Sequence, residues 1–131
     1  MKISQALREK TLLSFELFPP KTEKGMENLP GTIDHLMKYK PAYISCTYGA
    51  GGGNVGANRE VCQMIKKAGT TPVTHFTVIK NTKEGIKEQL DQYLAEGVDH
   101  MLALRGDIPL GETTTCGDFN YATDLVKFVR D

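Results

Sequence analysis

The sequence lacks an excess of either charge, a long hydrophobic run and a cluster of cysteines. Its 16 basic and 16 acidic residues cancel and are interleaved in the predicted helices, which argues against a nucleic-acid-binding surface. No segment approaches the ~18 apolar residues of a membrane span, and the N-terminus lacks the apolar run of a secretory signal. We therefore expect a cytoplasmic protein with neither a nucleic-acid nor a membrane partner.

The cysteines and histidines show no metal-binding pattern. Cys46, Cys62 and Cys116 are odd in number and widely spaced, and they include no C-x-x-C pair, which argues against a disulfide framework and a zinc site. The three histidines show no metal-ligand spacing either. We expect a reducing compartment and no bound metal.

What is present is an ordinary composition for one core. The chain has 131 residues, of which 40% are hydrophobic and 24% charged, so a single domain over residues 1–131 is expected. Short β-rich segments alternate with helical patterns, and the strands are expected near residues 12–18, 42–48, 72–79 and 99–104. Their starts lie about 30 residues apart, the length of a strand plus a crossover helix. This spacing predicts an α/β fold of consecutive parallel (β/α) units.

Two architectures accept four such units, an open doubly wound sheet or about half of a (β/α)₈ TIM-type barrel, since a complete barrel needs about 250 residues. Apolar periodicity predicts helices over residues 26–39, 58–68, 82–96 and 118–129, and a short helix near residues 3–7. Pro30 fits the first of these helices only in or just before its first turn, because proline cannot donate the helical hydrogen bond.

Alternation along the strands sorts the side chains onto two faces. One face is expected to pack against helices, and it carries Phe15, Leu17, Ile44, Cys46, Phe76, Val78, Leu102 and Leu104. The other face is smaller and more polar, and at or near the C-terminal strand ends it carries Glu16, Thr47, His75 and Arg105. Active sites of parallel α/β folds lie at this end of the sheet, so these four residues are candidates for a site.

Glu16 lies in the segment Ser-Phe-Glu-Leu-Phe-Pro-Pro, among apolar neighbours and just before a proline pair that ends the strand. A carboxyl group that is removed from water keeps its proton more readily, which suits a general acid. The alternative is a glutamate on an edge strand that points into water, as most glutamates do.

Two loops follow strands and contain glycine. The run from Tyr48 to Gly56 offers backbone amides to a phosphate or a flat ring, but it lacks the features of a P-loop or a dinucleotide fingerprint, and a flexible loop explains it equally well. In Leu-Arg-Gly-Asp-Ile-Pro, the Arg105 guanidinium can hold an anionic or carbonyl group and the Asp107 carboxylate can orient a polar ring. The alternative is a local Arg–Asp pair that only orders the loop.

Five ordered motifs together resemble methylenetetrahydrofolate reductase. They are Ser-Phe-Glu-Leu-Phe-Pro-Pro-Lys, Ser-Cys-Thr-Tyr-Gly-Ala, Thr-His-Phe-Thr, Ala-Leu-Arg-Gly-Asp-Ile-Pro and Tyr-Ala-Thr-Asp-Leu-Val, and the similarity spans nearly the whole chain from Leu13. The resemblance implies a (β/α)₈ barrel that holds FAD at the C-terminal strand ends. It also implies oxidation of NADH or NADPH and reduction of 5,10-methylenetetrahydrofolate to 5-methyltetrahydrofolate, in one-carbon metabolism and methionine biosynthesis.

The resemblance also implies roles for single residues. Glu16 matches the family's general acid, which protonates the folate, and Asp107 matches an aspartate near the flavin ring and the folate. Thr47 matches a position close to the nicotinamide as well as to FAD. The positions that match FAD contacts are Thr47, Tyr48, Ala50, His75, Arg105, Gly106, Asp107, Tyr121 and Ala122.

The family further implies strands five to eight, so we expect the chain to be an N-terminal portion that pairs with the missing barrel half or forms a homo-oligomer. Two other functions are compatible with the residues. One is a non-catalytic βα fragment that binds a partner or a pterin. The other is a phosphate-handling aldolase or isomerase, for which Lys80 is the only plausible Schiff-base lysine.

Overall fold

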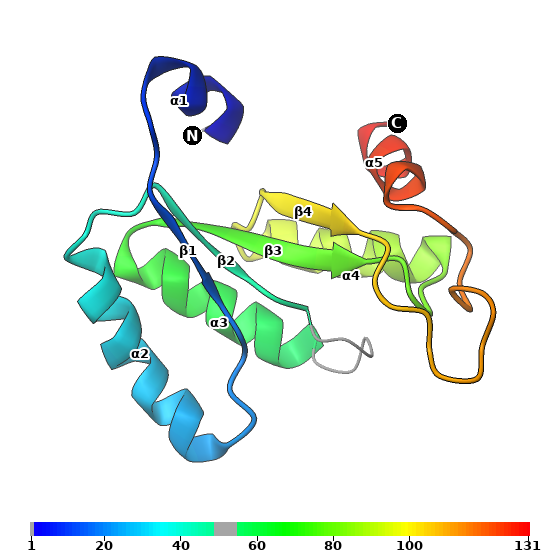
Figure 1. Cartoon of the computed structure of the whole chain (residues 1–131), viewed down its shortest axis with the longest axis horizontal. Coiled ribbons are helices and arrows are strands. Elements are labelled where there is room, and N and C mark those ends of the chain that lie inside the picture. Colours follow the sequence, from blue (N-terminus) through cyan, green and yellow to red (C-terminus); the bar gives the residue numbers. More distant parts are fainter. Residues whose placement is uncertain (1, 49–54) are drawn as a thin grey trace.

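A computed structural model describes residues 2–48 and 55–131 (Figure 1). Four strands form one parallel sheet in the order β1-β2-β3-β4. The strands are β1 (Ser14–Leu17), β2 (Tyr43–Cys46), β3 (Thr71–Thr77) and β4 (Met101–Leu104), and the helices are α1 (Ile3–Glu9), α2 (Glu23–Met37), α3 (Val55–Ala68), α4 (Lys83–Ala95) and α5 (Ala122–Arg130). The four strands lie close to their predicted positions, and the α/β fold of parallel βα units is confirmed.

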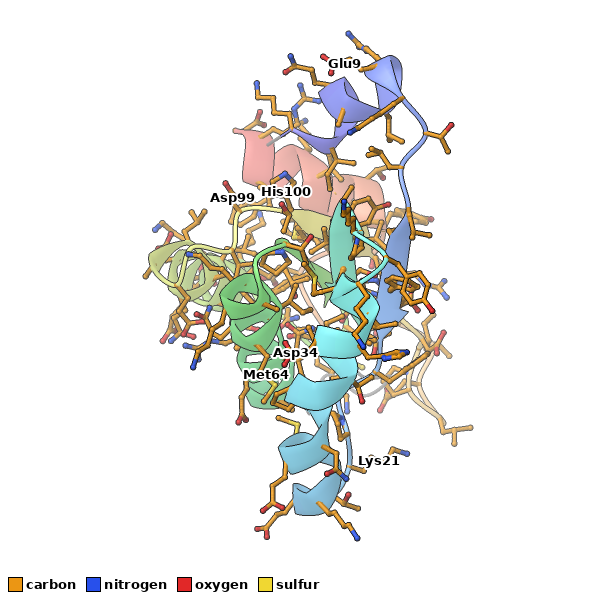
Figure 2. The ribbon with its side chains drawn as sticks, turned by 90° about the vertical axis from the view of Figure 1, so that its left-hand side faces the viewer. Glu9, Lys21, Asp34, Met64, Asp99 and His100 are labelled. Carbon is orange, nitrogen blue, oxygen red and sulfur yellow. The ribbon has the colours of Figure 1, made fainter. Side chains whose placement is uncertain are left out.

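The strands follow one another across the sheet in chain order, whereas a doubly wound sheet reverses its order at a switch point. One face of the sheet packs against the helices: Ile44, Cys46, Phe76 and Val78 share a buried core with residues of α2 to α5. The edge-on view of Figure 2 shows α2, α3 and α4 gathered on one side of the strands. Sequential strand order with helices on a single face is the arrangement of half of a (β/α)₈ barrel.

The predicted faces of the fourth strand are wrong by one residue. The register pairs His75 with Leu102 and Phe76 with Ala103, and neighbours across a ladder point to the same face. Leu102 therefore lies on the face opposite the helices, where it is 46% exposed, while Ala103 packs against the core. Cross-strand pairing decides which face a short strand buries, and the hydrophobicity of four residues does not reveal it.

The prediction for Pro30 is also wrong, because this residue lies in the interior of α2. The helix begins earlier than expected, since Thr22 caps it by accepting a hydrogen bond from the Gly25 N–H at 3.0 Å. An interior proline costs about 3 kcal/mol. Leu29 and Ile33, on either side of it in the helix, are buried in the core and offset this cost.

The helix predicted from Asp118 begins instead at Ala122. The Asp118 carboxylate accepts a hydrogen bond from the Lys83 N–H at 2.8 Å, so it caps α4 and does not start the last helix. The Asp124 carboxylate accepts from the N–H groups of Asn120 and Tyr121 and so fixes the start of α5. The short first helix is confirmed, and Thr82 caps α4 by accepting a hydrogen bond from the Gly85 N–H at 3.1 Å.

Within the described residues, no helix is long and apolar enough to cross a membrane. All three cysteines are free thiols. Burial raises the pKa of Cys46 and of Cys62 to about 12, so both act as packing residues and not as nucleophiles.

Candidate functional site

A polar hollow of ≈ 320 Å³ lies at the C-terminal ends of β2, β3 and β4. We call it the strand-end hollow, and it is lined by Thr47, Tyr48, His75, Thr77, Leu104, Arg105, Gly106 and Asp107. Six of these residues are site residues expected from the sequence. The structure brings them together because parallel strands deliver their C-terminal ends to one edge of a sheet.

The end of β2 is held by Asn58, a fully buried residue of α3 that sequence reasoning missed. Its Nδ2 donates hydrogen bonds to the carbonyls of Cys46 and Thr47 at 3.1 and 2.9 Å. Its Oδ1 accepts from the Thr74 hydroxyl at 2.8 Å and from the Tyr93 hydroxyl at 2.6 Å. The amide thus ties three other elements to the point where the chain enters the hollow, and every buried polar atom in this group has a partner.

Tyr48 is anchored from the helix layer. Its hydroxyl donates to Gln89 Oε1 at 2.9 Å, and its ring packs on Phe76 with 5.2 Å between centroids. Burial raises the pKa of Tyr48, so its phenol stays neutral. Gln89 in turn donates to Asn81, whose amide donates to the Thr77 carbonyl at 2.8 Å, so this chain of hydrogen bonds braces the end of β3.

The end of β4 turns into the hollow at Gly106, which has a φ of +84°. A methyl group there would lie 2.6 Å from Ile79 Cγ1 and 3.1 Å from Thr77 Cβ, so only glycine fits. Arg105 Nε donates to the Gly106 carbonyl at 3.0 Å. Among the described residues no Arg105–Asp107 ion pair is found, so the local pair considered from the sequence does not form and both groups stay free to meet a ligand.

A second hollow of ≈ 420 Å³ lies on the face of the sheet opposite the core. We call it the inner-face hollow, and its lining residues are Ile3, Ser14, Phe15, Glu16, Tyr43, Ser45, Val73, His75, Met101 and Leu102. His75 lines both hollows and so connects Glu16 to the residues of the strand-end hollow.

Glu16 faces the site but is not removed from water. Its carboxylate Oε2 lies 3.7 Å from His75 Nε2, yet the Glu16 side chain is 51% exposed. The apolar neighbours that the sequence supplied, Phe15 and Leu17, point to the opposite face and pack against the core. Of the two interpretations of Glu16, the glutamate on an edge strand that reaches water describes this structure, and its carboxylate lies next to His75, which lines the strand-end hollow.

Two buried polar atoms have no hydrogen-bond partner within the described residues: His75 Nε2 and Thr77 Oγ1. Burial lowers the pKa of His75, an effect that the Glu16 charge partly opposes, so the imidazole is neutral near pH 7. Thr77 is a second residue missed by sequence reasoning. Its position two residues after His75, on the same face of β3, was the available signal.

The remaining expected site residues lie elsewhere. Tyr121 and Ala122 mark the start of α5 and line neither hollow, and Tyr121 is 65% exposed. Lys80 is exposed and also lines neither hollow. Ala50 lies outside the described residues. Across residues 2–48 and 55–131, no three His, Cys, Asp or Glu side chains gather as metal ligands.

A parallel βα sheet with a polar hollow at the C-terminal ends of its strands is the architecture of an α/β protein of the barrel type. The chain belongs to the methylenetetrahydrofolate reductase family, whose family model matches residues 2–131. The family resemblance seen in the five motifs is thereby confirmed.

Individual relatives agree. The chain is 36% identical over 120 residues to the 5,10-methylenetetrahydrofolate reductase of Pectobacterium carotovorum subsp. carotovorum, covering 91% of this chain and 39% of the relative. It is 34% identical over 120 residues to the Escherichia coli (strain K12) protein of that name, covering 91% and 40%. It is 33% identical over 139 residues to a probable methylenetetrahydrofolate reductase (NADH) of Oryza sativa subsp. japonica, covering 99% and 23%. The chain thus spans about two fifths of the bacterial relatives' length and under a quarter of the rice relative's.

Proposed function

We propose that the chain contributes the flavin and folate site of a methylenetetrahydrofolate reductase, which reduces 5,10-methylenetetrahydrofolate to 5-methyltetrahydrofolate with NADH or NADPH. The observation that carries this proposal is the convergence in one hollow of Thr47, His75, Arg105, Gly106 and Asp107. These residues come from the ends of three strands and line the same hollow. The family membership of the chain supports the same reaction.

The residues of the strand-end hollow fit FAD. Gly106 leaves the backbone open at the rim, and the Arg105 guanidinium is a donor for carbonyl or phosphate oxygens. Thr77 adds a buried hydroxyl that has no hydrogen-bond partner among the described residues. Hydride-transfer chemistry comes from the flavin when it is bound. The protein supplies binding, orientation and protons.

Glu16 is the proton donor in this proposal. Its half-exposed carboxyl lies in the inner-face hollow and shares His75 with the flavin side, so a folate between the two hollows meets both groups. The Glu16 O–H bond breaks as the proton passes to a folate nitrogen, which opens the five-membered ring of the substrate. Asp107, at the rim of the strand-end hollow, accepts hydrogen bonds from the pterin and orients it.

The catalytic unit includes further barrel strands. In this half of a barrel, β1 and β4 are the edge strands of the sheet, and Leu102 is exposed on the inner face next to the polar residues of the site. Closing the sheet would cover these groups and would remove Glu16 from water, the condition that favours its protonated form. The remaining strands come from a longer chain, a complementary half or a second copy.

The test replaces Glu16 by Gln and measures two half-reactions in the flavin-loaded catalytic unit. We expect folate reduction to fall at least about 100-fold, because general acid catalysis is lost. Oxidation of NADH or NADPH with an artificial electron acceptor is expected to stay near the wild-type rate, since it needs no acid at this position. Equal losses in both half-reactions would contradict the role of Glu16.

A non-catalytic fragment is the second candidate. It is favoured by the half-exposed Glu16 and by the share of the bacterial relatives that the chain covers. A colourless preparation that gains no flavin on addition of FAD, yet has a defined dimer mass, would support it against the enzyme.

A further inference from the structure

The contact between Glu16 and His75 has a specific geometry that the proposed roles do not explain. Glu16 lies on β1 and His75 on β3, so the two side chains reach toward each other across β2. Two strand spacings amount to about 9.6 Å, and the reaching atoms end only 3.7 Å apart. Such an approach needs open space above the strand between them.

Ser45 provides that space. It pairs in register with Glu16 on one side and with Val73 on the other, and it is a small, buried residue of the inner-face hollow. His75 lies two residues beyond Val73 on the same face of β3. The Glu16 carboxylate therefore crosses β2 above Ser45 to reach the imidazole, and a bulky side chain at position 45 would block the crossing.

His75 has one atom that needs this partner. The His75 side chain is only 8% exposed, and Nε2 is buried with no hydrogen bond in the described part of the chain. An unpaired buried nitrogen costs about 1–3 kcal/mol. The exposed carboxylate needs to move by less than about 1 Å to reach hydrogen-bond distance, and catalytic hydrogen bonds are often long before substrate binds.

We propose that His75 is a positioning residue for Glu16, whose protonated carboxyl donates its hydrogen bond to the Nε2 of the neutral imidazole. This inference rests on the proposed function, in which Glu16 is the acid. A partner that accepts from the protonated carboxyl stabilises the form that can donate a proton. After Glu16 has passed its proton to the folate nitrogen, Nε2 of His75 takes up a proton from the solvent. The Nε2–H bond then breaks as this proton passes to the Glu16 carboxylate, which restores the carboxyl group and the neutral imidazole.

Few other charges act on this pair. The titratable or charged groups that line the two hollows around His75 are Glu16, Tyr43, Tyr48, Arg105 and Asp107. Of these, only Glu16 lies within 4 Å of the imidazole as an ion-pair partner. Removing the Glu16 charge should therefore shift the pKa of His75, which burial otherwise sets.

The experiment is a pH titration of the purified chain followed by ¹H–¹⁵N correlation spectra of its histidine rings. The chain has three histidines, so His75 is assigned by one substitution. We expect Glu16→Gln to lower the pKa of His75 further, because the carboxylate that favours the imidazolium is gone.

The matched control is the other carboxylate–histidine pair. Asp99 Oδ1 lies 2.8 Å from His100 Nδ1, and both residues, labelled in Figure 2, lie just before β4. Asp99→Asn should leave the titration of His75 unchanged. A His75 titration that is the same in the wild type and in Glu16→Gln would overturn the proposal.

A second readout tests positioning in the flavin-loaded catalytic unit. His75→Leu should lower the folate half-reaction at least about tenfold, and His75→Gln, which keeps a hydrogen-bonding group at similar reach, should restore part of it. If Leu and Gln reduce the rate equally while both variants stay folded, the pairing is not what matters. The ring titration needs neither flavin nor turnover, so it can fail while the proposed function stands, and the reverse also holds.

Discussion

At the scale of single residues, the site depends on groups that do no chemistry. Both polar atoms of the Asn58 side-chain amide are hydrogen-bonded inside the protein. Its Nδ2 donates to two carbonyls at the end of β2, and its Oδ1 accepts from the hydroxyls of Thr74 and Tyr93. A buried polar group with all its partners rigidifies its surroundings. The position of Thr47 in the strand-end hollow therefore depends on a residue of α3.

We predict that Asn58→Ala lowers the free energy of unfolding by about 3 kcal/mol, because two carbonyls and two hydroxyls lose a buried partner. Urea denaturation measures this change. Asn28→Ala, at an exposed position of α2, is the control and should shift stability by less than about 0.5 kcal/mol. A loss for Asn58→Ala as small as that of the control would show that the network does not stabilise the fold.

Most residues of the strand-end hollow could be predicted from the sequence, but the residues that hold them in place could not. Thr47, His75, Arg105 and Asp107 could be predicted because polar residues at the ends of predicted strands must converge in a parallel sheet. Asn58 could not, because a helix asparagine is ordinarily solvated, and only the fold shows which carbonyls it meets. The exposure of Glu16 was also beyond the sequence, since it depends on which strands surround β1.

At the level of the elements, the loop after β4 needs glycine at position 106 for two reasons: a left-handed backbone angle and close packing against neighbouring side chains. Gly106 and Gly111 have nearly the same backbone angle, with φ values of +84° and +82°. An added methyl group at Gly106 would collide with Ile79 and Thr77, whereas at Gly111 it would meet nothing within 4 Å. Alanine substitutions at these two glycines therefore separate the free-energy cost of the left-handed backbone angle from the cost of the steric collision.

We predict that Gly111→Ala costs about 1 kcal/mol, the strain of a left-handed backbone. Gly106→Ala should cost about 3 kcal/mol, because the collision with Ile79 adds to that strain. Thermal unfolding of both variants measures the difference, and Gly106→Ala should also weaken any ligand of the strand-end hollow. Equal losses in the two variants would mean that the close approach at Gly106 relaxes freely.

The elements themselves were predictable where local chemistry decides them. Strand positions and the Thr82 cap follow from patterns of a few neighbouring residues. The failures came from contacts distant in sequence: Asp118 caps α4 across a gap of 35 residues, and the faces of β4 follow from its pairing with β3. Pro30 is tolerated inside α2 because the free energy gained by burying the apolar residues of that helix exceeds the cost of an interior proline.

At the scale of the whole molecule, the sheet has a covered face and an open one. Helices α2 to α5 pack against one face, while the other presents Glu16, Leu102 and the two hollows. Parallel sheets are ordinarily covered on both faces. We therefore predict that the site works in an assembly that closes over the inner face, and that a lone chain binds flavin poorly.

Sedimentation velocity of the chain with FAD, followed at both the protein and the flavin absorbance, tests this central claim most directly. We predict that flavin absorbance sediments with a species larger than the monomer. Arg105→Ala should weaken this binding at least about tenfold because a charge-assisted contact is lost, and Arg130→Ala, at the far end of α5, should leave it unchanged. Flavin that sediments stoichiometrically with the monomer would overturn this expectation, because the open inner face would then need no cover.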